Sequence, residues 1–172
     1  MADLDPYLSG WSWTPGAFSW VEPTSYSLMA LKKLKRSLAG TSCEERIRQG
    51  EMLIYDRMCE NGGWNYGNSR VLGEALWPYP DVTAVALIAL QDRAASEANQ
   101  TSLRALDGMM REAASGTALS WGILCLTLYN QDVREWKTIL VKNFEKTRFL
   151  GETKAAALAL LAFGNGARLF RV

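Results

Sequence analysis

Histidine is absent from the 172-residue sequence, which removes the commonest metal ligand and the commonest general base of enzymes. No Ser–His or Cys–His pair can form for nucleophilic catalysis. Zinc sites with a histidine ligand are excluded for the same reason. We therefore expect neither a metal nor another cofactor.

Cysteine is scarce, and so are the features of a secretion signal. Cys43, Cys59 and Cys125 show no Cys-x-x-Cys spacing and are odd in number, so the sequence predicts neither a disulfide framework nor a zinc knuckle. The first ten residues contain acids and a proline where a secretion signal has basic and apolar residues. We expect a cytoplasmic protein, with peripheral contact to a membrane surface as an alternative.

The chain has no large excess of positive or negative charge and no long apolar run. The chain has 19 basic and 18 acidic residues, so nucleic acid is not an expected partner. Its longest apolar stretch, residues 154–163, is shorter than the ~18 residues of a transmembrane helix. Hydrophobic residues nevertheless make up 48% of the chain, which is enough for the core of one domain spanning residues 1–172.

One sequence pattern occurs four times. Each copy has a threonine at its third place, followed by a nearly unbroken run of apolar or small residues. Near the start of three copies, Glu22, Asp81 or Ser115 can accept from the free N–H groups of a first helical turn, as caps or as partners of the helix dipole. Such helices are buried on most sides. The copies are EPTSYSLMAL (22–31), DVTAVALIAL (81–90), SGTALSWGIL (115–124) and GETKAAALAL (151–160), with Thr24, Thr83, Thr117 and Thr153.

Segments of a different character lie between these copies. Residues 42–61, 99–114 and 132–150 alternate apolar and charged residues at helical spacing, and Ser42 with Glu45 forms a capping box. Buried helices should therefore alternate with half-exposed ones. No stretch shows convincing strand alternation. The predicted helices are 23–39, 42–60, 81–96, 101–114, 117–129, 132–147 and 152–163.

Two glycine–tryptophan loops also match each other. SGWSWTPG (9–16) aligns with GGWNYG (62–67), so that Trp11 pairs with Trp64 and Trp13 with Tyr66. The glycines allow tight turns, and the large rings can pack between neighbouring helices. The alternative is that these rings form a platform for a carbohydrate or a cation.

These residues resemble the α/α-toroid repeats of squalene and oxidosqualene cyclases and of prenyltransferase-like proteins. NGGWNYG is similar to the glycine–tryptophan repeat loop of triterpene cyclases, and the resemblance covers residues 9–163, with 164–172 as a tail. It implies an all-α partial ring of about seven helices, in which inner helices line an apolar cavity and outer helices face solvent. At ~40 residues per repeat, the chain is long enough for about half of a closed ring.

The resemblance also implies candidate functional residues. In these cyclases a catalytic aspartic acid protonates an alkene or an epoxide, and it belongs to a sequence motif that ends in Asp-x-Thr-Ala. Residues Asp81 to Ala84 match the end of this motif. Asp81 is therefore the candidate catalytic acid, acting on an isoprenoid-type ligand. The acids that assist the donor in squalene cyclases are missing beside it. Candidate ligand-binding aromatics, which would stabilise a cation through their ring faces, are Trp11, Trp13, Trp64, Tyr66 and Trp77.

A noncatalytic helical-repeat module is the alternative function. Such a module would bind a protein or a lipid, or would associate with a second copy. Half a ring can stand alone as a crescent, form a homodimer, or belong to a longer cyclase-like chain. A glycoside-active enzyme using Asp81 with Glu74 or Glu22 is a further option, for which the spacing offers no evidence.

Overall fold

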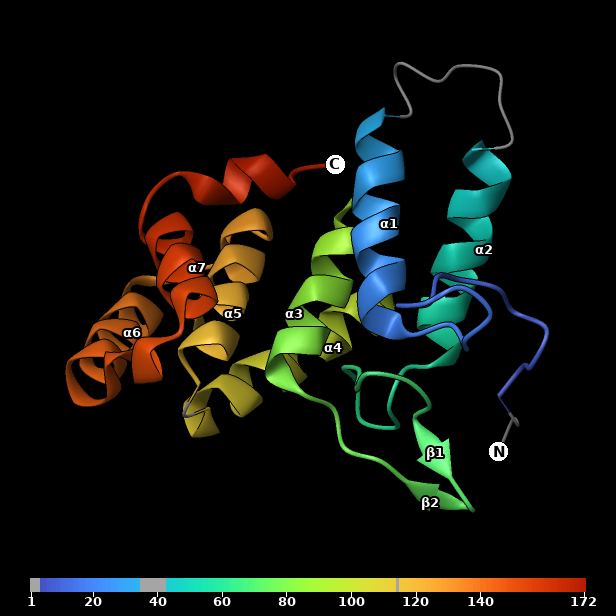
Figure 1. Cartoon of the computed structure of the whole chain (residues 1–172), viewed down its shortest axis with the longest axis horizontal. Coiled ribbons are helices and arrows are strands. Elements are labelled where there is room, and N and C mark those ends of the chain that lie inside the picture. Colours follow the sequence, from blue (N-terminus) through green and yellow to red (C-terminus); the bar gives the residue numbers. More distant parts are fainter. Residues whose placement is uncertain (1–3, 35–42, 114) are drawn as a thin grey trace.

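The computed structural model describes residues 4–34, 43–113 and 115–172. These residues form seven α-helices and one short antiparallel hairpin (Figure 1), so the prediction of a mostly helical chain is confirmed. Three 3₁₀ turns accompany them: η1 (Gln91–Arg93), η2 (Arg148–Gly151) and η3 (Gly166–Phe170). The helices are α1 (Val21–Leu34), α2 (Cys43–Asp56), α3 (Pro80–Ala89), α4 (Glu97–Glu112), α5 (Gly116–Leu128), α6 (Arg134–Thr147) and α7 (Thr153–Phe163).

The helix boundaries differ from prediction mainly between α3 and α4. Helix α3 ends at Ala89, well before the predicted residue 96, because the turn η1 follows it. Helix α4 begins earlier than predicted, since the Ser96 hydroxyl accepts from the Asn99 N–H and caps it. The predicted end of the first helix at 39 and the cap from Ser42 lie outside the described residues.

The hairpin was not predicted. Strand β1 (Arg70–Val71) pairs with β2 (Glu74–Ala75). Strands of two residues are too short to show the alternation by which strands are recognised. The turn between them, Leu72 and Gly73, has positive φ at both positions, which is typical of a tight hairpin turn.

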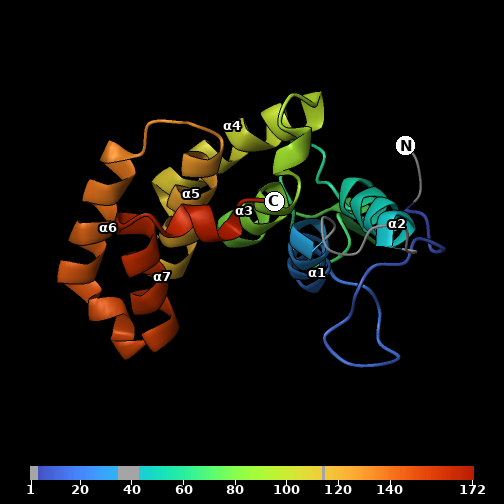
Figure 2. The same cartoon turned by 90° about the horizontal axis from the view of Figure 1, so that it is seen from above.

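The helices form two layers. Helices α1, α3, α5 and α7 pack side by side in one row, and α2, α4 and α6 pack against them. Seen from above, the row bends, and α6, α4 and α2 lie outside it (Figure 2). Every residue of α3 from Val82 to Ala89 is buried, and so is most of α5. The predicted burial is confirmed for α3 and α5, whereas α7 has only four buried residues and α1 buries no more of its residues than α2 does.

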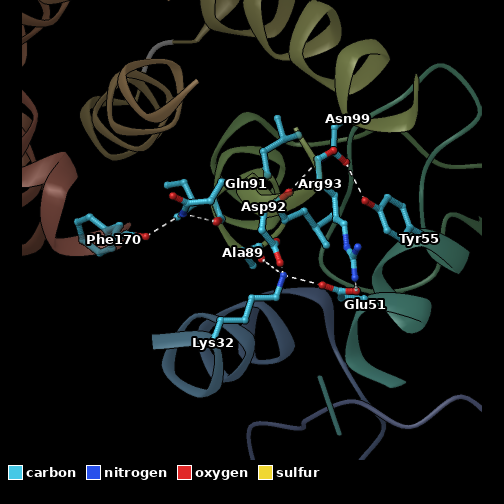
Figure 3. Close-up of polar contacts among 12 residues, drawn as sticks. Lys32, Glu51, Tyr55, Ala89, Gln91, Asp92, Arg93, Asn99 and Phe170 are labelled. Atoms are coloured by element: carbon cyan, nitrogen blue, oxygen red, sulfur yellow. Dashed lines mark hydrogen bonds and ion pairs between the residues drawn. The ribbon is translucent and has the colours of Figure 1, made fainter. Parts of the chain in front are cut away.

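A polar network closes the C-terminal end of α3 (Figure 3). The last carbonyls of a helix have no partner within the helix and need one elsewhere. Here the carbonyls of the last three residues of α3 and of its C-cap residue, Leu90, each accept from a side chain. The pairs are Tyr129 Oη with Leu87 O (2.8 Å), Gln91 Nε2 with Ile88 O (2.7 Å), Lys32 Nζ with Ala89 O (2.7 Å) and Asn99 Nδ2 with Leu90 O (3.0 Å).

Lys32 is the charged centre of this network. Its ammonium lies 2.6 Å from a carboxylate oxygen of Glu51 and 2.6 Å from one of Asp92. The side chains of Lys32 and Glu51 are only 5% and 9% exposed. Arg93 reaches the other oxygen of Glu51 at 3.2 Å. Lys32 therefore joins α1, α2 and the end of α3, which links the two layers.

Candidate functional site

The first glycine–tryptophan loop is tied to α1 by a buried threonine. The main-chain N–H of Trp11 donates to Thr24 Oγ1 at 2.9 Å, and that hydroxyl donates back to the carbonyl of Trp11 at 3.3 Å. The N–H of Trp20, one residue before α1, also donates to the Trp11 carbonyl. Both main-chain polar groups of Trp11 are thereby satisfied at the start of α1.

The second loop makes the same bonds at the start of α3. The N–H of Trp64 donates to Thr83 Oγ1 at 2.9 Å, and that hydroxyl donates to the Trp64 carbonyl at 3.2 Å. The N–H of Tyr79, one residue before α3, donates to the same carbonyl. Tryptophan and threonine are 13 residues apart in the first loop and 19 in the second, where the chain between them includes the β-hairpin.

Glycine precedes each tryptophan because the threonine comes so close. A Cβ at Gly10 would lie 2.3 Å from Thr24 Oγ1, and one at Gly63 would lie 2.9 Å from Thr83 Oγ1. The Gly–Trp pair and the threonine at the third place of the helix segment are thus parts of one contact. Thr117 and Thr153 take no part in such a contact: Thr117 Oγ1 donates to Glu152 at 3.5 Å, and Thr153 is exposed.

Two of the predicted ligand-binding tryptophans pack between helices. Trp64 is completely buried, and its indole N–H donates to the carbonyl of Ile54 near the end of α2 at 2.6 Å. Trp11 is partly buried, with the guanidinium of Arg46 from α2 4.3 Å from its ring centre. Because Trp64 is completely buried, neither face of its ring is open to a ligand. We therefore assign Trp64 to packing between the loop and α2.

The other three predicted aromatics are exposed. Trp13 is 59% exposed, and its ring lies 6.4 Å from that of Tyr26 in α1. Tyr66 is 41% exposed and lies 5.4 Å from Tyr79. Trp77 is 80% exposed in the segment after the hairpin. The structure thus brings Trp13 and Tyr66 toward other aromatic rings and leaves Trp77 in solvent.

Asp81 lies in the first turn of α3 but does not cap the helix. The N-cap is Tyr79, with no side-chain cap, and Pro80 is the first helical residue. The expectation that Asp81 caps α3 is wrong because the helix begins one residue earlier than predicted. Its carboxylate instead accepts from the hydroxyl of Tyr66 at 3.3 Å. Asp81 remains partly exposed, and its charge complements the positive end of the helix dipole.

Two tyrosines face the acids at this end of the helix row. Tyr66 donates to Asp81, and Tyr26 donates to Glu22 Oε1 at 3.0 Å. Burial and then the charge of Asp81 raise the pKa of Tyr66 to about 12. Burial and then the charge of Glu22 raise the pKa of Tyr26 above its ordinary value. Both phenols therefore stay protonated at neutral pH and act as donors.

Four aromatic rings from four parts of the chain form a continuous row. Trp13 contacts Tyr26 of α1, Tyr26 lies 6.3 Å from Trp121 of α5, and Trp121 lies 5.2 Å from Phe170 of η3. Tyr26 and Trp121 come from the helices on either side of α3. Because α4 packs on the outer side of α3, we place this aromatic row on its inner side.

Sequence reasoning missed three members of the aromatic row: Tyr26, Trp121 and Phe170. A signal for the first two was present, because each is a large ring among small residues in one of the repeated helix segments. A ring at such a place must point to a side of the helix that has room for it. Phe170 carried no comparable signal.

Thiol and metal chemistry find little support in the described residues. Burial raises the pKa of the Cys125 thiol and that of Cys59, so neither is present as a reactive thiolate at neutral pH. In residues 4–34, 43–113 and 115–172, no group of three or more metal-ligating side chains comes together.

None of the helices in the described ranges is long and apolar enough to cross a membrane.

A groove of about 570 Å³ lies between the N-terminal segment and the loop before α1. Its lining includes Tyr7 and Phe18, which are 92% and 89% exposed, and Trp20. The guanidinium of Arg57 also lines it and is ion-paired with Asp56. Asp81 is not part of the lining, so the groove and the acid are separate features.

Comparison with known proteins found no match, whether against protein-family models, curated proteins or solved structures. The resemblance to triterpene cyclases therefore rests on the loops and the helix pattern of the chain itself.

Proposed function

We propose that this chain is an α/α-toroid-type helical-repeat module that binds an apolar, isoprenoid-type ligand on the inner side of its helix row. The observation that carries the proposal is the aromatic row through Trp13, Tyr26 and Trp121, in which neighbouring ring centres lie 6.4 and 6.3 Å apart. Apolar ligands with double bonds pack well against such rings, and sites lined by aromatic side chains commonly hold them.

The hydrogen bonds of the two loops support the toroid-type interpretation. The same pair of main-chain groups meets the same hydroxyl at the starts of α1 and α3. Repeated contacts of this kind are expected where successive units of a repeat stack on one another. The two-layer packing of the helices points in the same direction.

The surroundings of Asp81 favour binding over proton-initiated chemistry. A carboxylic acid that protonates an alkene must stay protonated until the substrate arrives, which requires desolvation or a neighbouring negative charge that opposes its ionisation. Asp81 is partly exposed, accepts a hydrogen bond from Tyr66, and is flanked in sequence by Pro80 and Val82. We assign it an electrostatic role at the start of α3.

A binding and turnover experiment tests the proposed function. We expect the protein to bind farnesol in equilibrium dialysis and to form no cyclised product from farnesol or squalene. Tyr26→Ala should weaken farnesol binding about tenfold, the loss of ~1.4 kcal/mol that one aromatic contact can account for. Trp77→Ala removes an exposed ring outside the aromatic row and is the matched control, with unchanged binding expected.

The same experiment can contradict the proposal in two ways. If the wild-type protein forms a product that Asp81→Asn does not form, the chain is an enzyme and Asp81 is its acid. If farnesol does not bind, or if Tyr26→Ala and Trp77→Ala behave alike, the aromatic row is not the binding surface.

Association with a second copy is the second candidate function, and α7 is the observation that favours it. This helix stands at the end of the inner row, with Leu160 76% and Phe163 43% exposed. Helices α3 and α5 bury their large apolar side chains between neighbours on both sides, and α7 lacks such cover.

A substitution on α7 tests this association. We expect light scattering to show a mass that rises with concentration, and Leu160→Lys should keep the protein monomeric because a charge on an apolar contact must be desolvated. Leu72→Lys, at the 99% exposed tip of the hairpin, is the matched control and should associate like the wild type. A wild-type protein that stays monomeric at all concentrations contradicts the role of α7.

A further inference from the structure

The last segment of the chain crosses the inner helices. We call residues 164–172 the C-terminal strap. It leaves α7, passes over the upper end of α5 as η3, and ends beside α3 and α1 (Figure 1). The strap thus lies over the helices whose rings form the aromatic row.

The strap is fixed at its start by close packing. Gly166 and Ala167 are buried. A Cβ at Gly166 would come within 2.6 Å of the carbonyl oxygen of Leu161, so only glycine fits this close approach to α7. The strap therefore leaves α7 in a defined direction.

Farther along, two side chains hold the strap by its main chain. The ammonium of Lys33 in α1 donates to the carbonyl of Leu169. The amide of Gln91, just after α3, donates to the carbonyl of Phe170 at 2.8 Å (Figure 3). Lys33 itself is exposed, and a hydrogen bond at a solvent-exposed site contributes little net stability. The bond from Gln91 is part-buried, and Phe170 and Val172 pack against the core as partly buried side chains, whereas Gly166 and Ala167 at the start of the strap are buried.

Only one side chain of the strap joins the aromatic row. The ring of Phe170 meets that of Trp121 edge to face, 5.2 Å away and with 69° between the ring planes. The neighbouring side chain of Leu169 is 55% exposed. Trp121, in contrast, is only 6% exposed. Phe170 is therefore one of the groups that cover Trp121, together with Tyr26 and the core in which Trp121 is packed.

We propose that the strap is autoinhibitory: the ring of Phe170 occupies the place on Trp121 that an apolar ligand takes, and the ligand binds when the strap moves aside. The inference rests on the proposed function. Its physical basis is that ring and ligand compete for one apolar surface. Because the apparent affinity scales with the fraction of molecules whose surface is open, a closed strap weakens binding without any change in the surface itself.

Two substitutions that loosen the strap test the inference. Phe170→Ala removes the competing ring, and we expect farnesol to bind about tenfold more tightly, as when the open fraction rises tenfold. Lys33→Ala removes one of the two bonds to the strap and should strengthen binding in the same direction by a smaller factor. Leu169→Ala is the matched control, since it shortens the adjacent exposed side chain and keeps the main-chain carbonyl; its affinity should equal that of the wild type.

Equilibrium dialysis with radiolabelled farnesol measures all four proteins, and circular dichroism confirms that each is folded. If wild type and Phe170→Ala bind farnesol equally, or if Phe170→Ala binds more weakly, the strap is not inhibitory and the proposed function stands. If neither protein binds farnesol, the proposed function fails, and the strap proposal fails with it. If Leu169→Ala gains as much affinity as Phe170→Ala, competition by the ring is refuted.

Discussion

Replacing Lys32 by Met is expected to lower the free energy of unfolding by about 3–5 kcal/mol, the usual cost of removing one partner of a buried ion pair. Lys32 is 5% exposed and lies 2.6 Å from Glu51, which is itself 9% exposed. Without the ammonium, the Glu51 carboxylate keeps Arg93 as its one cationic partner among the described residues, and the Ala89 carbonyl at the end of α3 loses the donor Lys32. Urea unfolding followed by circular dichroism measures the change.

Lys33→Met is the matched control for this prediction. It removes the same charge from the next residue, which is exposed and whose ammonium donates to the Leu169 carbonyl of the strap. We expect a change of less than about 1 kcal/mol, as for exposed charges in general. The double substitution Lys32→Met and Glu51→Leu should recover part of the lost stability, because no unpaired charge is then left buried. A loss below about 1 kcal/mol for Lys32→Met, the range of an exposed pair, would show that the network does not hold the layers together.

Replacing Trp64 by Ala is expected to destabilise the protein by about 3–5 kcal/mol, the range for truncating a fully buried large aromatic side chain. The indole is completely enclosed, and its N–H satisfies the carbonyl of Ile54. Its removal leaves a cavity between the loop and α2 and takes away one of the two hydrogen bonds to the Ile54 carbonyl, which also accepts from the Arg57 N–H at 3.2 Å. Thermal and urea unfolding should both report the loss.

Trp77→Ala gives the contrast. Trp77 is also a tryptophan near the second loop and was predicted for the same role, but it is 80% exposed. Its removal should change the free energy of unfolding by less than about 0.5 kcal/mol, as for surface substitutions generally. Equal losses for Trp64→Ala and Trp77→Ala would contradict the assignment of Trp64 to packing.

The candidate site was predictable only where its parts lie close together in the sequence. Asp81 could be placed at the start of a helix, because a proline and an acid precede an apolar run there. The helix begins one residue earlier than predicted. Because of this shift, Asp81 lies inside the first turn, where it complements the helix dipole and does not cap the helix. The aromatic row was not predictable as a whole, because Tyr26 and Trp121 meet only through the packing of α1, α3 and α5.

The sequence by itself determined the helices and the two loops. Apolar periodicity, helix starts and the Gly–Trp pairs depend on neighbours a few residues apart, and local steric and hydrogen-bonding preferences act at that range. The matching bonds from Trp11 to Thr24 and from Trp64 to Thr83 explain why the two loops have similar sequences.

Only the tertiary structure decided which side chains are covered. Lys32 and Asp92 are 60 residues apart in sequence, and Lys33 and Leu169 are 136 apart. No local pattern encodes such contacts, because they depend on how whole helices pack. The same reason separates Trp64 from Trp77: the residue type is identical, and burial in the packed chain makes one of them part of the core and leaves the other in water.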